Sequence, residues 1–204
     1  RYNATVRNVS KMAKDKLTLD LSFMLSSVKE QNMTAQGLYF NPWVSLYLFP
    51  AGDDFSKVQA YQRYNGERNL QTQYWDYSTN LALQNPYWIT ERIKMPNHKN
   101  RYMASASLKY DFADWINLTG RVKMDRNNER RERMYDAGTN TLFASDYGYY
   151  SKSNVESQQL YGELLLNVNK YFVDNTYNLT VNAGANFENN DYQSDYFGGK
   201  LKST

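Results

Sequence analysis

Cysteine is absent from the 204 residues, and histidine occurs only once, at position 98. Without thiols the chain has no disulfide, no thiolate metal site and no cysteine nucleophile. One histidine cannot build a histidine-based metal centre, and the polar neighbours Asn97 and Lys99 indicate that His98 lies in an exposed loop rather than a catalytic triad. We therefore expect no enzymatic activity, no metal site and no cofactor.

Long apolar runs are also missing, since no stretch approaches the roughly 20 apolar residues that a membrane-spanning helix needs. The 24 basic and 21 acidic residues nearly cancel, to a net charge of +3, which gives no reason to expect a nucleic-acid partner. The chain is instead rich in rings: 19 Tyr, 9 Phe and 4 Trp make up 16% of it. Tyr and Trp combine an apolar body with a polar tip, which suits membrane–water interfaces and sugar-binding surfaces.

Strict alternation of apolar and polar residues is the dominant pattern. It recurs in about six segments, 2–6, 17–25, 102–112, 116–124, 160–168 and 179–187, and a period of two indicates strands with one apolar and one wet face. The apolar face is predicted to carry Leu19, Leu21, Leu118, Val122, Leu164, Leu166, Val181 and Ala183. The polar face is predicted to carry Asp20, Arg121, Lys123, Glu163 and Asn182.

The connections between these segments alternate in length. Short ones fall at 11–16, 113–115 and 174–177, and long ones at roughly 31–99 and 127–154. Outer-membrane β-barrels have short periplasmic turns and long extracellular loops, and aromatic girdles mark their interfaces. Aromatic residues bracket two of the short turns: Phe112 and Trp115 at one, and Tyr171, Phe172 and Tyr177 at another. The pattern favours an all-β, antiparallel, up-and-down transmembrane barrel.

A soluble antiparallel sandwich also alternates, so this alternative stays open at the level of pattern. Small residues such as Ala104, Ala106 and Gly120 on the apolar face are a poor filling for a packed core. Charges deep in the strands, such as Arg121 and Glu163, suit a wet lumen but also suit a solvated sandwich face. The residues thus favour the membrane barrel without excluding a soluble sheet.

Four segments, in this order, resemble the barrel of the SusC/RagA family of TonB-dependent importers. They are LTLD at 17–20, FNP at 40–42, LYLFPAGDD at 46–54 and QNPYW at 84–88. The family often carries a basic residue where this chain has Ala51. The resemblance implies that residues 1–204 are a partial barrel domain, about six strands of a 22-stranded barrel, with a long extracellular loop at roughly 31–99. The family's plug domain and TonB box have no counterpart, so we expect a piece of a longer protein.

The same resemblance implies function and location. The complete protein would lie in the outer membrane of a Gram-negative bacterium, in contact with its lipid, and would import oligosaccharides or peptides. A SusD-like surface lipoprotein would cover it, and TonB would act through the missing plug region. From the residues alone, the alternative is a soluble carbohydrate-binding or adhesive β-sheet module. An outer-membrane enzyme is a third and weaker alternative, because no catalytic set is present.

The long loop supplies the candidate contacts to substrate or lid: Tyr39, Trp43, Tyr74, Trp75, Tyr87 and Trp88. Aromatic faces stack on sugar rings. The alternative, which we favour for most of these residues, is that the loop folds around its own small core and that the aromatic rings pack inside this core.

Two charged clusters also have alternative interpretations. The arginines at 126, 130, 131 and 133 are interleaved with acids, which favours a solvated, self-paired extension over contact with outer-leaflet sugars or phosphates. The Asp53–Asp54 pair could hold calcium, but solvated loop charge is the preferred interpretation.

Overall fold

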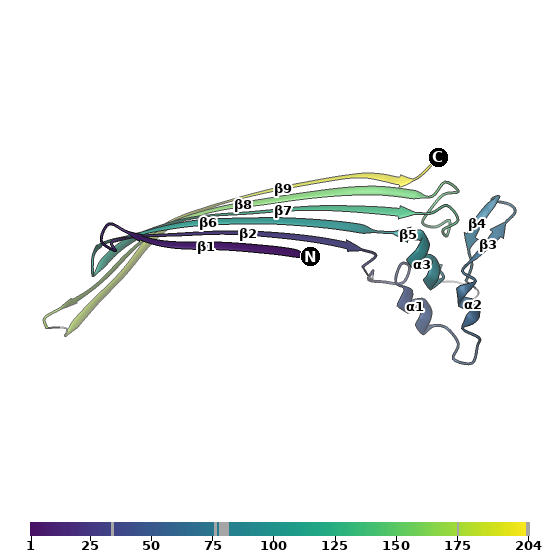
Figure 1. Ribbon diagram of the computed structural model, residues 1–204, viewed down its shortest axis with the longest axis horizontal. Coiled ribbons are helices and arrows are strands. Elements are labelled where there is room, and N and C mark those ends of the chain that lie inside the picture. Colours follow the sequence, from purple (N-terminus) through teal and green to yellow (C-terminus); the bar gives the residue numbers. More distant parts are fainter. Residues whose placement is uncertain (34, 76, 78–81, 175, 203–204) are drawn as a thin grey trace. The chain divides into compact units, whose positions relative to one another are not determined.

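The computed structural model describes residues 1–33, 35–75, 77, 82–174 and 176–202. Within these residues, six long strands carry the six alternating segments: β1 (Tyr2–Met12), β2 (Leu17–Gln31), β6 (Pro96–Ala113), β7 (Ile116–Tyr135), β8 (Tyr149–Phe172) and β9 (Tyr177–Lys200). They lie side by side in that order (Figure 1), and the short β5 (Ile93–Lys94) pairs with β7. The predicted all-β, up-and-down order of strands is confirmed.

The tight turns follow from backbone conformations that narrow hairpins require. Ala13, Lys14 and Asp15 have positive φ angles, and the amide of Lys16 donates to the carbonyl of Ala13 at 3.3 Å. Consecutive positive φ angles give a turn whose twist matches that of paired strands. The predicted short connections at 11–16 and 113–115 are confirmed, while residue 175 of the third lies outside the described residues.

The second long connection, predicted at 127–154, is wrong in its bounds. β7 continues to Tyr135 and β8 begins at Tyr149, so that the connection is 136–148. Residues 126–133 are polar on both faces of the strand, so they lack the apolar alternation by which strands were recognised. His98 is a similar correction, because it lies in β6 and not in a loop, with its side chain exposed.

The chain divides into two compact units. The first, here called the sheet unit, comprises Arg1–Val28, Lys99–Glu129 and Val155–Ser194. The second, here called the loop unit, comprises the described residues of Lys29–His98, Arg130–Asn154 and Asp195–Thr204. Its segment between β2 and β5 holds α1 (Pro42–Tyr47), α2 (Ser56–Gln59), the hairpin β3 (Gln62–Asn65) and β4 (Leu70–Gln73), and α3 (Pro86–Arg92).

The sheet unit has two chemically different faces and, among its described residues, no buried apolar core. The register pairs Val6 with Phe23 on one face and Arg7 with Ser22 on the other. Every buried hydrophobic residue identified in the described chain belongs to the loop unit. The apolar side chains of the sheet, such as Phe23, Val122 and Leu164, are instead exposed. No helix in the described part of the chain is long and apolar enough to cross a membrane.

The core of the loop unit consists of two aromatic clusters. One is built on Trp88, Ile89, Ile93, Tyr135 and Ala144. The other is built on Val58, Trp75 and Leu83. The first cluster joins α3 to the 136–148 connection, because the indole nitrogen of Trp88 donates to the hydroxyl of Thr139 at 3.1 Å. The two long connections of the chain therefore fold together as one body.

Candidate functional site

Cross-strand ion pairs cover the polar face of the sheet unit. Arg7 binds both carboxylate oxygens of Asp20, at 3.0 and 2.7 Å. Arg121 binds Glu163 at 3.0 Å. The alternation of β7 and β9 adds Lys123 and Asn182 to this face. The ion pairs and the alternation together place the predicted polar residues on one side of the sheet.

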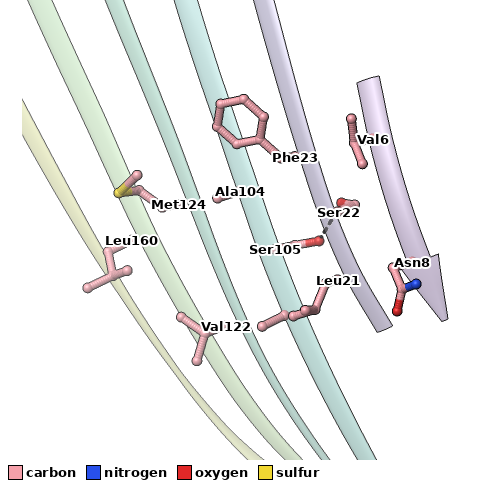
Figure 2. Close-up of a pocket in the computed structure, with 11 residues that line it drawn as sticks. Val6, Asn8, Leu21, Ser22, Phe23, Ala104, Ser105, Val122, Met124 and Leu160 are labelled. Carbon is pink, nitrogen blue, oxygen red and sulfur yellow. Dashed lines mark hydrogen bonds between the residues drawn. The ribbon is translucent and has the colours of Figure 1, made fainter. Parts of the chain in front are cut away.

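The opposite face carries a shallow hollow of about 620 Å³ that is lined mainly by apolar side chains (Figure 2). Leu21 and Phe23 of β2 line one side of it, and Val122 and Met124 of β7 line the other. Ala104 of β6 lies between them, so its small side chain forms the floor. Few polar atoms are available to orient a ligand here, and we interpret this face as a surface for apolar packing.

The apolar band has a nearly constant width on the five longer strands, whereas on the outer strand β1 the same face carries Asn8 and Ser10. On the five longer strands it covers 17–25, 102–112, 116–124, 160–168 and 179–187. These columns are about 9 to 11 residues long, which is the length at which a tilted strand crosses the hydrocarbon of a bilayer. Beyond Met124 the same face of β7 presents Arg126, which binds Glu156 of β8 at 3.1 Å. The band therefore ends at an ion pair, although both strands continue.

Rings and a lysine gather at the other end of the band, beside the tight turns. The rings of Tyr110 and Phe112 are 4.8 Å apart, edge to face. The Lys170 ammonium lies 4.3 Å from the centre of the Trp115 ring. Exposed rings with a lysine whose stem covers them are typical of a membrane–water boundary.

A second hollow, of about 510 Å³, lies on the polar face across β6 to β9, and we call it the polar recess. Its lining includes Arg101, Asp125, Ser157, Gln159, Asn190 and Tyr192. These residues are far apart in the chain and only the strand register brings them together, so the amino-acid sequence alone does not predict this recess.

The predicted contact residues of the long loop fall into two groups. Trp88 is 1% exposed and Trp75 is 9% exposed, so both side chains pack in the core of the loop unit. Tyr87 packs against the second cluster, and Tyr74 lies under the Arg63 guanidinium, 3.1 Å from the ring centre. Trp43 is 57% exposed and Tyr39 is 40% exposed, so both side chains are accessible to a ligand.

The QNPYW segment is the polar centre of the loop unit. Its Asn85 caps α3 by accepting from the amide of Tyr87 at 2.8 Å, and Pro86 occupies the first helical turn. The Asn85 side-chain amide also donates to the carbonyls of Val58 at 2.8 Å and Tyr74 at 3.1 Å. Asn41 and Pro42 begin α1 in the same manner. These Asn-Pro pairs are the sequence signal by which both helices could have been found.

Both carboxylates of the Asp53–Asp54 pair accept hydrogen bonds from neighbouring protein groups. Asp53 accepts from the hydroxyl of Tyr77 and from Lys57, and its pKa falls to about 2, chiefly because of the Tyr77 hydrogen bond. Asp54 binds the amide and hydroxyl of Ser56. Among the described residues, no group of three or more His, Cys, Asp or Glu is placed to hold a metal ion. Both aspartates are thus engaged in hydrogen bonds with neighbouring residues of the loop.

The basic cluster is partly self-paired. Arg126 binds Glu156, and Arg130 binds Glu132 within β7. Burial raises the pKa of the Tyr135 hydroxyl, and the neighbouring Arg133 partly offsets this shift. These pairs support the interpretation of a solvated strand extension.

Neither the models of known protein families nor the curated proteins give a match to this chain. The SusC/RagA resemblance therefore remains a prediction.

Proposed function

We propose that this chain is a wall segment, with its extracellular loops, of a SusC/RagA-like TonB-dependent importer in the Gram-negative outer membrane. The apolar face meets lipid. The polar face, with Asp20, Arg121, Lys123, Glu163 and Asn182, lines the lumen through which an oligosaccharide or peptide passes. The outer strands β1 and β9 each have a free edge in the described sheet, and these edges pair with further strands of the complete barrel.

The constant width of the apolar band carries the proposal. β2 has 15 residues and β8 has 24, yet their apolar columns are of similar length. A bilayer imposes such a limit, since its hydrocarbon has one thickness for every strand, about 25 Å in outer-membrane barrels. A soluble sandwich would bury this face against a second layer, but in the described residues of the sheet unit the face is exposed.

The loops take the outer side in this proposal, where a SusD-like lipoprotein would cover them. Trp43 and Tyr39 are the remaining candidate contacts to lid or substrate. Energy would reach the complete protein from TonB through its plug.

Cysteine is absent from these 204 residues, so a thiol introduced here reports on one position once any cysteine elsewhere in the complete protein has been replaced by serine. Leu164→Cys and Asn167→Cys, made singly in the complete protein, place a thiol on each face of β8. In outer-membrane vesicles a charged, water-soluble maleimide should label Asn167→Cys, whereas Leu164→Cys should react only with a lipid-soluble reagent. Tyr47→Cys, in the exposed end of α1, is the positive control for aqueous labelling.

Equal aqueous labelling at both positions, in a protein that dissolves without detergent, would favour the soluble carbohydrate-binding or adhesive module.

A further inference from the structure

We propose that the apolar face of the sheet unit holds one membrane lipid at a fixed place. The acyl chain lies in the hollow of Figure 2, here called the apolar hollow. A headgroup that carries both a phosphate and a primary amine lies in a charged hollow beside it. This inference rests on the proposed function, because it needs the apolar face to lie in a bilayer. It adds a binding site, a ligand class and two residues that select the headgroup, Arg126 and Asp191.

The charged hollow, of about 300 Å³, lies where the apolar band ends. Its lining includes Arg126 of β7, Glu156 and Gln158 of β8, and Asp191 and Gln193 of β9. These positions continue the alternation of the apolar columns on their strands. Their side chains therefore lie on the same face of the sheet as the band.

The two hollows adjoin along two strands. Met124 and Leu160 line the apolar hollow (Figure 2), while Arg126 and Gln158 line the charged hollow. On each strand the apolar residue is two positions from the polar one, which corresponds to about 7 Å. An apolar hollow that continues into a charged one matches an amphiphile better than a ligand that is polar or apolar throughout.

Arg126 is the member of the basic cluster that lines the charged hollow. It directs one guanidinium nitrogen, Nη2, to Glu156 at 3.1 Å, and both side chains of this pair are about half exposed. A guanidinium has five N–H donors, so Arg126 can bind a phosphate while it keeps the contact with Glu156. The structure therefore places a phosphate-binding group just beyond the apolar band.

Asp191 supplies the opposite charge from a different strand. Strand β8 separates it from Arg126, so the two backbones are about 10 Å apart. Asp191 accepts from the amide of Asn189 through Oδ2, at 3.1 Å. An ionised carboxylate has about four acceptor positions, so Asp191 can also accept from a ligand ammonium group.

The balance of charge in the hollow selects the headgroup. Its lining holds one arginine against two carboxylates, Glu156 and Asp191. The resulting negative balance disfavours a headgroup that carries phosphate alone. A phosphate joined to a primary amine, as in ethanolamine phosphate, satisfies both signs, with its phosphate on Arg126 and its ammonium on Asp191.

The test uses the complete protein in detergent and a phosphatidylethanolamine with a photoreactive group on one acyl chain. After illumination, mass spectrometry maps the cross-linked peptides. We expect the cross-links to concentrate on the segments of β7 and β8 that hold Met124 and Leu160. Unlabelled phosphatidylethanolamine should displace the probe at a concentration about tenfold lower than phosphatidylglycerol, which lacks the amine, a difference of one good contact.

Lipid A with and without an ethanolamine phosphate group is a second pair of competitors. The form with ethanolamine phosphate should compete more strongly than the form without it, by the same reasoning. Whether this lipid A or phosphatidylethanolamine displaces the probe at the lower concentration identifies the source of the headgroup.

Two variants test the selecting residues. Arg126→Gln and Asp191→Asn should each weaken binding of phosphatidylethanolamine by about tenfold, and Asp191→Asn should also reduce the preference over phosphatidylglycerol. Arg101→Gln is the matched control, because it removes a guanidinium that pairs with Asp125 on the polar face, outside the charged hollow. It should bind the lipid like the unmodified protein. Heat-modifiable migration on gels checks that each variant forms a barrel.

Four results would overturn the inference. Cross-links spread evenly along the apolar band would show that the lipid has no fixed place. Equal competition by phosphatidylglycerol would show that the amine is not recognised, and equal competition by water-soluble ethanolamine phosphate would show that the acyl chain is not bound. Unchanged lipid binding in both Arg126→Gln and Asp191→Asn would remove the assigned headgroup contacts.

The labelling of Leu164→Cys and Asn167→Cys separates the two proposals. Correct labelling with evenly spread cross-links rejects the lipid site alone. Failure of the labelling pattern rejects the importer itself.

Discussion

Asn85 shows how much of the loop unit depends on one side chain. It is fully buried and holds together the start of α3, Val58 of α2 and Tyr74, the residue that follows β4. An asparagine can do this because its amide donates two hydrogen bonds while its oxygen accepts a third.

We predict that Asn85→Ala destabilises the loop unit by about 2–4 kcal/mol, through loss of a helix cap and of two donors to buried carbonyls. Hydrogen exchange of the 35–95 segment in the complete protein measures this. Asn41→Ala removes a cap from the exposed α1 start and should cost about 1 kcal/mol. Similar losses for both variants would show that the buried donors contribute little.

Asp53 gives the loop an acid-sensitive contact. Its folded pKa of about 2 lies below the ordinary value, so ionised Asp53 stabilises the loop above about pH 4. This contribution is lost as the pH falls towards about 2. Tyr77→Phe removes the largest cause of the shift, so the loop should open at a higher pH.

Pepsin cleavage of the loop between about pH 2 and pH 5 measures this opening. Ser56→Ala is the control, because Ser56 binds Asp54 and not Asp53. An unchanged cleavage profile in Tyr77→Phe would contradict the assigned cause.

At the scale of the element, β8 is the best strand on which to test the two faces. Leu164→Arg should destabilise the complete barrel by about 2–4 kcal/mol, because it places a charged guanidinium in hydrocarbon, where water does not solvate it. Asn167→Arg, on the polar face where Asn167 meets Asn117 at 2.9 Å, should cost far less. Refolding titrations into lipid vesicles compare them. Equal costs would indicate that no bilayer contacts Leu164.

Close packing between β8 and β9 gives a second prediction for the strands. A Cβ built on Gly162 would overlap the Phe187 ring, whereas one on Gly120 would lie 3.8 Å from Leu164. Gly162→Ala should therefore cost about 1–3 kcal/mol, and Gly120→Ala should be tolerated. The same refolding titration distinguishes them. An equal response would mean that the Phe187 ring turns aside freely.

At the scale of the whole molecule, the tryptophans of the loop separate folding from function. Trp88→Ala removes the centre of the first aromatic cluster and should cost the loop unit about 3–5 kcal/mol, with loss of uptake. Trp43→Ala should leave loop stability unchanged, because its ring is exposed. It should still weaken substrate capture or lid docking.

An uptake assay paired with co-purification of the lid protein is the measurement. Normal import and lid retention in Trp43→Ala would show that Trp43 contributes neither to substrate capture nor to lid docking. The assignment of the sheet would be unaffected.

The sequence by itself determined the strands and their two faces. The reason is local: side chains of a strand alternate with a period of two, so the columns at 116–124 and 160–168 are visible without tertiary information. Turn positions follow from the breaks in that pattern. Residues 126–133 are polar on both faces of the strand, so apolar–polar alternation does not detect them. For this reason the sequence predicts an end of β7 that is too early.

Only the tertiary structure decided which aromatic residues are buried and which residues form the recess. Trp43 directly follows Asn41-Pro42, and Trp88 comes two residues after Pro86. Both therefore lie in the first turn of a short helix, and local sequence does not show which one is buried. Trp88 is buried because the 136–148 connection packs on it through Thr139, from 51 residues away. The recess likewise depends on strand register, which places Arg101 beside Asp125 and Gln159 beside Glu188. Burial and register are long-range properties, and the chain alone does not encode them in any short segment.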